Sequence, residues 1–375
     1  MNRIRLALLG ALMFSITIPM KSMATPPDSR GVQFLPFTSF AAFAQSSGSN
    51  ANEIVLTSPE IQTRVCWDEL IASWNAELKP DAYLKLEVRA IYTNRTTKWF
   101  TLGLWSVDSA QHPRESVKKQ KDADGDVDTD TFQLREPTGR VQVRLTLGST
   151  SDKTPKLKFF SLSVLDSKWK SESREPNRAA WGKLLDVTER SQMAYPNGEV
   201  LCSATTTSML LSYWSQKLNR PGLDCDVPEV IKGVYDSAWG GTGNWVFNTA
   251  FAGSFRWMRA YTTRLSNVTE LEGFIARGIP VGLSVCYNRL RGKGREPSGH
   301  LVVLVGFTKD GDAIINDPGT SKNVRKVFPR ANLIDAWAYS KNAVYLVYPT
   351  STILPRDEAG HWESLTAKRL VEFSP

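Results

Sequence analysis

The chain has 375 residues, of which 41% are hydrophobic and 22% are charged, and this length fits two domains of ordinary size. The composition excludes a globally disordered chain and a collagen-like fibre, and Gly and Pro recur without a period, which excludes a long coiled coil. The formal net charge of +8 is mild for this length, so no nucleic acid partner is expected, because that class of protein needs a concentrated basic face.

The first 24 residues have the features of a secretory signal peptide. Arg3 and Arg5 form a positive region, residues 6–19 form an apolar stretch too short to span a bilayer, and small residues lead up to Ala24. We expect cleavage after Ala24 and a secreted or periplasmic protein; an uncleaved anchor is the alternative. Cleavage leaves a net charge of +5, and no other stretch approaches the ~20 apolar residues of a membrane span. No stable membrane insertion is therefore expected.

Residues 25–51 show no pattern that assigns them, whereas residues 52–165 are typical of an all-β domain. Apolar and polar residues alternate with a period of two over 84–90, 100–104 and 141–147. Such alternation predicts strands with one buried and one solvated face. Several strands of this kind predict an antiparallel β-sandwich.

Aspartates at alternate positions from Asp122 to Asp130 superficially suggest calcium ligands. An EF-hand loop, however, needs Gly where Val127 stands and a bidentate Glu where Gln133 stands. We therefore predict a solvated hairpin loop and no metal site.

Residues 166–180 are dense in charged residues, Ser and Pro, and are expected to form a linker. In residues 181–350, helical periodicity comes first and apolar strands follow, which predicts an α+β domain. The expected helices cover 203–216, 226–238 and 268–277, and the expected strands cover 279–286, 301–307, 313–316 and 343–348. Residues 351–375 are left as a C-terminal tail.

The four cysteines are Cys66, Cys202, Cys225 and Cys286. They include no CxxC pair and none lies near a histidine in sequence, so a structural zinc site is not expected. In an oxidising compartment, Cys225 and Cys286 could pair because they fall in the same domain. Cys66, beside Trp67, is expected to be buried.

Cys202 opens a predicted helix, where the helix dipole and free N–H groups stabilise a thiolate. His300 starts a predicted strand, which would hold a general base rigidly. A hairpin turning at Asp310-Gly311 would place Asp317 beside His300, where a carboxylate orients the imidazole. These residues are the predicted nucleophile, base and orienting group. The alternative is a structural cysteine, a capping histidine and a turn aspartate that never meet.

The segment YPNGEVLCSATTTSMLLSYW at 195–214 resembles the nucleophile segment of papain-like cysteine peptidases. It is closest to the bacteriocin-leader (double-glycine) peptidases of cysteine-peptidase family 39. GHLVVLVGF at 299–307 and IINDP at 314–318 are similar to the His and Asp segments of that group. The loop 239–245 and the stretch 73–76 resemble secreted members that carry a β-domain in front.

The resemblance implies a papain-like fold for residues 181–350, no cofactor, and the roles given above for Cys202, His300 and Asp317. Two features depart from the family pattern. Ser203-Ala204 replaces the usual Gly-Pro. The oxyanion-hole Gln, which usually precedes the Cys by about six residues, is represented by Gln192, ten residues before Cys202. Asn197 is the possible substitute.

Asn244 and Trp245 are expected to line the substrate cleft, with a purely structural turn as the alternative. Four basic residues, Arg289, Arg291, Lys293 and Arg295, precede His300 and are separated by two glycines. These features predict that the loop is a lid that selects acidic substrates. The simpler interpretation is a solvated turn.

The sequence predicts a secreted cysteine peptidase that cleaves amide bonds of a peptide or protein substrate through a thioester acyl-enzyme. An amidase or acyltransferase would use the same triad. A rival of another class is a cell-surface or glycan-binding protein whose papain-like domain is an inactive scaffold. The β-domain is expected to be separable and non-catalytic.

Overall fold

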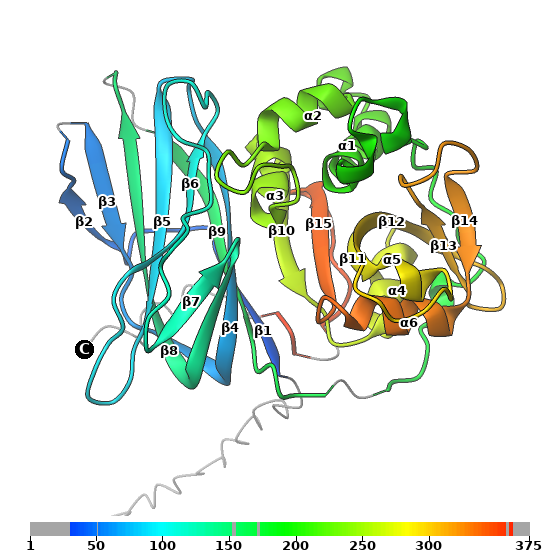
Figure 1. Cartoon of the computed structure of the whole chain (residues 1–375), viewed down its shortest axis with the longest axis horizontal. Coiled ribbons are helices and arrows are strands. Elements are labelled where there is room, and N and C mark those ends of the chain that lie inside the picture. The colour runs from blue at the N-terminus through cyan, green and yellow to red at the C-terminus, as the bar shows by residue number, and fades with distance from the viewer. Residues whose placement is uncertain (1–30, 51, 152–154, 171–172, 358–359, 363–375) are drawn as a thin grey trace, which may run out of the picture.

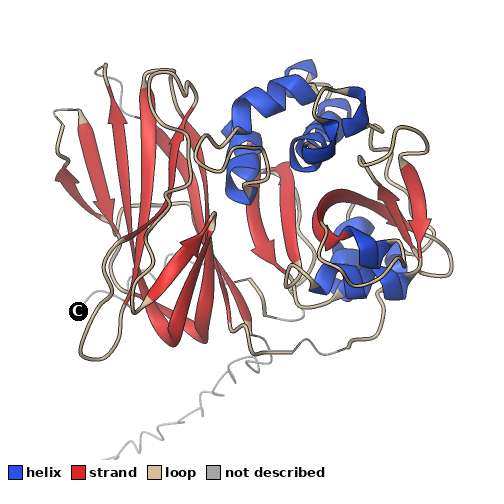
Figure 2. Cartoon of the chain, viewed as in Figure 1, coloured by secondary structure: helices blue, strands red, loops and turns tan. Residues whose placement is uncertain are grey.

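The structure is a computed structural model. It describes residues 31–50, 52–151, 155–170, 173–357 and 360–362. The expected signal peptide and the last residues of the tail lie outside the described residues. A region of strands and a region of mixed helices and strands pack side by side (Figures 1 and 2). Within the described residues, no helix is both long and apolar enough to cross a membrane.

The N-terminal region is one nine-stranded antiparallel sheet. Its strands are β1 (Val32–Phe37), β2 (Ala44–Ser47), β3 (Glu53–Thr57), β4 (Ile61–Glu77), β5 (Ala82–Ala90), β6 (Phe100–Ser106), β7 (Gly125–Asp128), β8 (Thr131–Ser149) and β9 (Lys156–Leu165). The order is β1-β9-β4-β8-β3-β2, with β5 and β7 also paired to β8 and β6 paired to β5. Because β4 and β8 span 17 and 19 residues, each pairs with different neighbours along its length. The strands therefore form one continuous sheet, not the two separate sheets of the predicted sandwich.

Strand β1 comes from the segment that the sequence pattern left unassigned. Five of its six residues are buried, so its two faces do not alternate in polarity and give no period-two signal. Its buried polar residue, Gln33, accepts a hydrogen bond from the backbone N–H of Arg64 at 2.8 Å. The segment 25–51 thus contributes β1 and β2 to the sheet.

The C-terminal region has six α-helices and a six-stranded antiparallel sheet in the order β10-β15-β11-β12-β13-β14. The helices are α1 (Cys202–Leu218), α2 (Val227–Val234), α3 (Trp245–Ser254), α4 (Val268–Ala276), α5 (Tyr287–Leu290) and α6 (Arg330–Ala338). The strands are β10 (Met258–Arg264), β11 (Val281–Cys286), β12 (Gly299–Phe307), β13 (Ala313–Asn316), β14 (Arg325–Phe328) and β15 (Ala343–Pro349). Each helix and strand predicted in this region is present, whereas α3, α5, α6, β10 and β14 were not predicted.

The edge strand β10 packs against the N-terminal sheet, and side chains of that sheet satisfy its free backbone groups. Asn75 of β4 donates to the carbonyl of Ala260 at 2.7 Å and accepts from its N–H at 3.1 Å. Two residues further on, the N–H of Thr262 donates to Ser73 Oγ at 3.0 Å. An open strand edge is thereby closed without strand pairing.

The same interface has an aromatic core. Phe247 of α3 packs against Trp74 and Trp105 of the N-terminal sheet, with ring centroids 6.1 and 5.3 Å apart. All three side chains are buried. Exposing this surface would be costly, because aromatic side chains each bury on the order of 150–250 Å². The interface therefore does not fit the expected independence of the β-domain.

Candidate active site

Cys202 is the first residue of α1, which runs through the interior with residues 203–215 all buried. The helix lies close to the sheet at Gly282 of β11, where a Cβ atom would stand 3.2 Å from the methyl group of Thr206. Several hydroxyls of this buried helix have partners, among them that of Ser203, which forms a 2.8 Å hydrogen bond with the Tyr345 hydroxyl. The Cys202 thiol therefore lies at the N-terminus of a rigidly packed helix, a position that favours a thiolate.

His300 is the second residue of β12 and is buried. Its Nε2 forms a 2.8 Å hydrogen bond with Oδ1 of Asp317, which follows directly after β13. Gly311 adopts a φ of +87° at the turn between the two strands, as the predicted hairpin requires. Since Asp317 occupies Nε2, Nδ1 is the nitrogen left for the Cys202 thiol.

Asp317 is fully buried and receives further hydrogen bonds. The Tyr287 hydroxyl donates to Oδ2 at 2.7 Å, the Gly319 N–H donates to Oδ1 at 3.0 Å, and Lys326 Nζ lies 3.4 Å from Oδ2. The Tyr287 ring also packs on the His300 ring, with centroids 4.3 Å apart. Tyr287 and Lys326 were missed because they lie on α5 and β14, which carry no clear periodicity.

The pKa shifts in this cluster favour a thiolate–imidazolium pair. Burial by itself would raise the pKa of Cys202, but a hydrogen bond and charge attraction from His300, with the N–H groups of Leu301 and Ser203, bring it below 9.0. Burial opposes the charged form of His300, yet Asp317 and Cys202 raise its pKa to about 9. Burial likewise opposes ionised Asp317, and His300 and Tyr287 lower its pKa to about 2. The structure thus brings together the three predicted residues in a form suited to nucleophilic attack.

A cleft of about 700 Å³ opens over Cys202 and His300. Trp245 lines it, as expected. Asn244 does not line it, because its buried side chain accepts from the Phe247 N–H at 3.2 Å and donates to Asp236 at 2.9 Å, and so caps α3. None of the four basic residues of the 289–295 loop lines the cleft either; Arg289 and Arg295 face Asp335.

Gln192 lies in a short 3-10 turn (Gln192–Ala194) that packs on a second one (Gly198–Val200), just before Cys202. These two turns take up the extra residues between Gln192 and Cys202. The Gln192 N–H donates to the carbonyl of Pro318 at 3.0 Å, beside Asp317. Its side chain is buried, and its Oε1 has no hydrogen-bond partner in the described part of the chain. Asn197, by contrast, is exposed in a left-handed turn with φ of 54°.

All four cysteines are free in the structure, so the possible Cys225–Cys286 disulfide is not formed. Burial raises the pKa of Cys225 to about 12. Cys66 is exposed, which makes its expected burial wrong. The alternation of β4 explains the error, because it turns Trp67 into the core and Cys66 outward.

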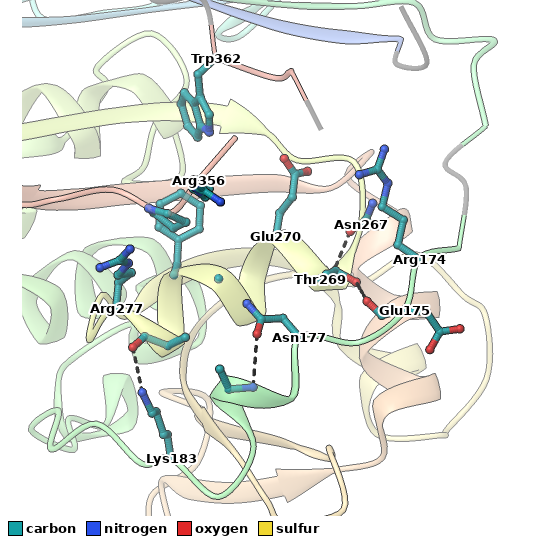
Figure 3. Close-up of a pocket in the computed structure, with 15 residues that line it drawn as sticks. Arg174, Glu175, Asn177, Lys183, Asn267, Thr269, Glu270, Arg277, Arg356 and Trp362 are labelled. Atoms are coloured by element: carbon teal, nitrogen blue, oxygen red, sulfur yellow. Dashed lines mark hydrogen bonds between the residues drawn. The ribbon is translucent and has the colours of Figure 1, made fainter. Parts of the chain in front are cut away.

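A second cavity, of about 750 Å³, lies between the linker, α4 and the residues Pro355, Arg356 and Trp362 (Figure 3). Its polar groups attach the linker and the residues after it to α4: Thr269 donates to the carbonyl of Glu175 at 3.2 Å, and Lys183 donates to that of Ala276 at 2.9 Å. Neither a cysteine nor a histidine is among the residues that line it. This cavity is therefore no candidate for the chemistry of Cys202.

Comparison with protein families gives two matches. Residues 184–345 match the Peptidase C39-like family, and residues 46–165 match the Peptidase C39 N-terminal domain. The chain is a C39-like protein with a C39-type N-terminal domain. This family indicates a cysteine peptidase, and the matched residues of the C39-like region include Cys202, His300 and Asp317. Curated proteins give no match.

Comparison with solved structures adds little to the family match. A chain from the infectious bursal disease virus Gx strain is 11% identical with a TM-score of 0.19, over 42% of this C39-like chain and 37% of its own length. The VPA0106 protein from Vibrio parahaemolyticus is 10% identical with a TM-score of 0.17, over 84% of this chain and 88% of its own. TM-scores this low support no statement about fold or function.

Proposed function

We propose that the chain is a cysteine peptidase of papain-like architecture that hydrolyses amide bonds of a peptide or protein through a thioester on Cys202. The observation that carries the proposal is the Cys202 thiol of lowered pKa at the start of α1, beside a His300 whose other nitrogen is bound to Asp317. A cysteine nucleophile needs a base within hydrogen-bond reach and a group that orients the base. The arrangement supplies both.

In the acylation step, the Cys202 thiolate attacks the substrate carbonyl carbon and forms a C–S bond. The His300 imidazolium gives its proton to the leaving nitrogen as the C–N bond breaks. In the second step, His300 takes a proton from water, the resulting hydroxide attacks the thioester, and the thiolate leaves. Asp317 fixes the His300 tautomer throughout.

Each attack places negative charge on the carbonyl oxygen. The Cys202 N–H at the helix start and the Gln192 side-chain amide are the proposed donors to this oxyanion. One such donor typically accounts for ~10²–10³ in rate. The buried side chain of Gln192, two short turns ahead of Cys202, supports this role.

We also propose export through the signal peptide at 1–24, with cleavage after Ala24. The n-region and the apolar stretch of the sequence support this part of the proposal. N-terminal sequencing of the protein recovered from the culture medium or the periplasm tests it. A protein that keeps its first 24 residues in the membrane fraction would contradict it.

Thiol labelling tests the central assignment. Because Cys66 is exposed, the experiment uses the Cys66→Ser chain, so that the other cysteines do not obscure Cys202. Iodoacetamide at pH 6–7 should modify Cys202 selectively and abolish hydrolysis of casein-derived peptides, and Cys202→Ala should resist both labelling and turnover. Cysteines that all react equally slowly, with no peptide hydrolysed, would favour the inactive scaffold.

A further inference from the structure

The cleft above Cys202 is built by both regions of the chain. Its N-terminal wall is the β7–β8 hairpin, which contributes residues 128–131 together with Gln133. Its C-terminal wall includes Trp239, Trp245 and Glu199. A substrate bound at Cys202 therefore contacts the N-terminal domain directly.

Hydrogen bonds from two residues of the N-terminal domain hold the loop 239–245, which carries Trp239 and Trp245, in place. Asp130 Oδ2 accepts the Trp245 N–H at 2.6 Å. The Ser116 N–H donates to Oδ1 of Asp236 at 3.0 Å, and the same oxygen accepts the Trp239 N–H at 3.0 Å. Asp130 and Asp236 are both buried. The aromatic wall of the cleft is thus fixed by contacts between the domains.

Trp239 is a large apolar side chain that remains 47% exposed. Its indole lies on its own loop, where a Cβ atom at Gly241 would stand 2.7 Å from the ring and one at Gly243 would also clash with it. The glycines of 239–245 therefore provide the space for the indole to lie flat. The exposed part of the ring lines the cleft.

The cleft is lined by more acidic than basic side chains. Arg264 and Lys341 also line it, but both are paired with Glu69, with 3.0 Å between Arg264 Nη2 and Glu69 Oε2. Asp128 and Glu199 are exposed and have no ion pair among the described residues. Glu199 lies three residues before Cys202 in the chain. Among the residues that line the cleft, the four carboxyl groups of Glu69, Asp128, Asp130 and Glu199 therefore outnumber the two cations of Arg264 and Lys341.

We propose that this cleft selects peptide substrates with a cationic side chain, whose stem packs on Trp239 and whose charge faces Asp128 and Glu199. A cation over an indole ring is attracted by its negative face, and carboxylates nearby add Coulomb attraction. The inference rests on the proposed peptidase function and names its substrate class. It replaces the acidic substrate expected from the 289–295 loop, which lies outside the cleft.

The test compares three fluorogenic peptides that differ at a single residue near the scissile bond: Lys, Gln or Glu. The Lys peptide should have a kcat/KM at least about tenfold above that of the Glu peptide at low salt, and the advantage should shrink as ionic strength rises. The double variant Asp128→Asn/Glu199→Gln should lose most of the advantage through KM. Trp239→Leu should raise KM for the Lys peptide about fivefold, and Trp239→Phe should restore part of it.

The matched control is Asp126→Asn, which removes a charge from the same hairpin outside the cleft and should leave the Lys preference intact. Binding of the same peptides to the Cys202→Ala chain, followed by tryptophan fluorescence, separates this proposal from the catalytic one. Preferential binding of the Lys peptide without turnover by the wild-type chain would overturn the peptidase proposal alone. Equal binding of all three peptides, or preference for Glu, would overturn the cationic selection.

Discussion

Asn75 in β4 forms two hydrogen bonds with the backbone of a single residue, Ala260, in the edge strand β10. The amide also packs directly against Gly253 of α3, where any Cβ atom would overlap it. One side chain of the N-terminal sheet thus satisfies both backbone groups of a strand in the other domain. The two domains depend on each other for a closed strand edge as well as for the cleft.

From this relationship we predict that residues 181–350 expressed alone do not fold to an active domain. In the full chain, Asn75→Ala should lower the free energy of unfolding by about 2–4 kcal/mol, because two buried backbone groups lose their partners at ~1–3 kcal/mol for each group left unsatisfied. Urea unfolding followed by tryptophan fluorescence measures the change. A soluble 181–350 fragment with full activity would contradict the prediction.

A second prediction concerns the pH dependence of kcat/KM. Activity needs the thiolate with the imidazolium, so it rises as pH passes the lowered pKa of Cys202 and falls as pH passes the His300 pKa of about 9. Asp317→Asn removes the carboxylate that raises the His300 pKa, so the basic limb should move to lower pH. Asn can still orient the ring, so the loss of rate should be smaller than in Cys202→Ala. An unchanged profile would exclude Asp317 as the orienting group.

Tyr287→Phe tests the hydroxyl that binds Asp317. Removing a hydrogen bond to a charged group costs about 1.5–3 kcal/mol, part of which bears on the position of His300. We predict a fall in kcat of about tenfold with KM little changed, because Asp317, and with it the His300 ring, is held less firmly. A fall confined to KM would assign Tyr287 to substrate contact instead.

The titration of Asp130 should make the free energy of unfolding depend on pH. Burial raises its pKa from 3.8 to about 6, so the folded chain binds this proton more tightly than the unfolded chain does. Its contribution to stability is therefore most favourable in acid, declines as pH rises from about 4 to 6, and is constant above that. The free energy of unfolding of Asp130→Asn minus that of the wild type should therefore be about 2 kcal/mol higher at pH 7.5 than at pH 4.5. A difference that does not change with pH would contradict the shifted pKa.

The sequence could predict those elements that have one apolar face and one polar face. Alternation placed β5 and β8, and the capping residue Asn267, which accepts the Thr269 N–H at 3.1 Å, placed the start of α4. In contrast, β10 and α3 are buried on almost every side, because they lie between the N-terminal sheet and the rest of their own region, so neither shows a period. Their burial is a consequence of domain packing, which no local pattern encodes.

The candidate site likewise has residues that the sequence could predict and residues that it could not. Cys202, His300 and Asp317 could be chosen because a helix start and a hairpin bring them together within one domain. The cleft wall from the β7–β8 hairpin could not, because only the interface carries Asp128 to the nucleophile. Asn244 was assigned to the cleft because α3 was not predicted, so nothing in the sequence marked Asn244 as the residue that caps a helix.

The central claim is that Cys202 forms a thioester with the substrate. Intact-protein mass spectrometry of the chain, quenched in acid during turnover of a peptide ester that acylates faster than it deacylates, tests it most directly. We predict a mass increase equal to the acyl group, located on Cys202 by fragmentation and absent from Cys202→Ala. Turnover of the substrate with the adduct missing, or with Cys202→Ala equally active, would contradict the account.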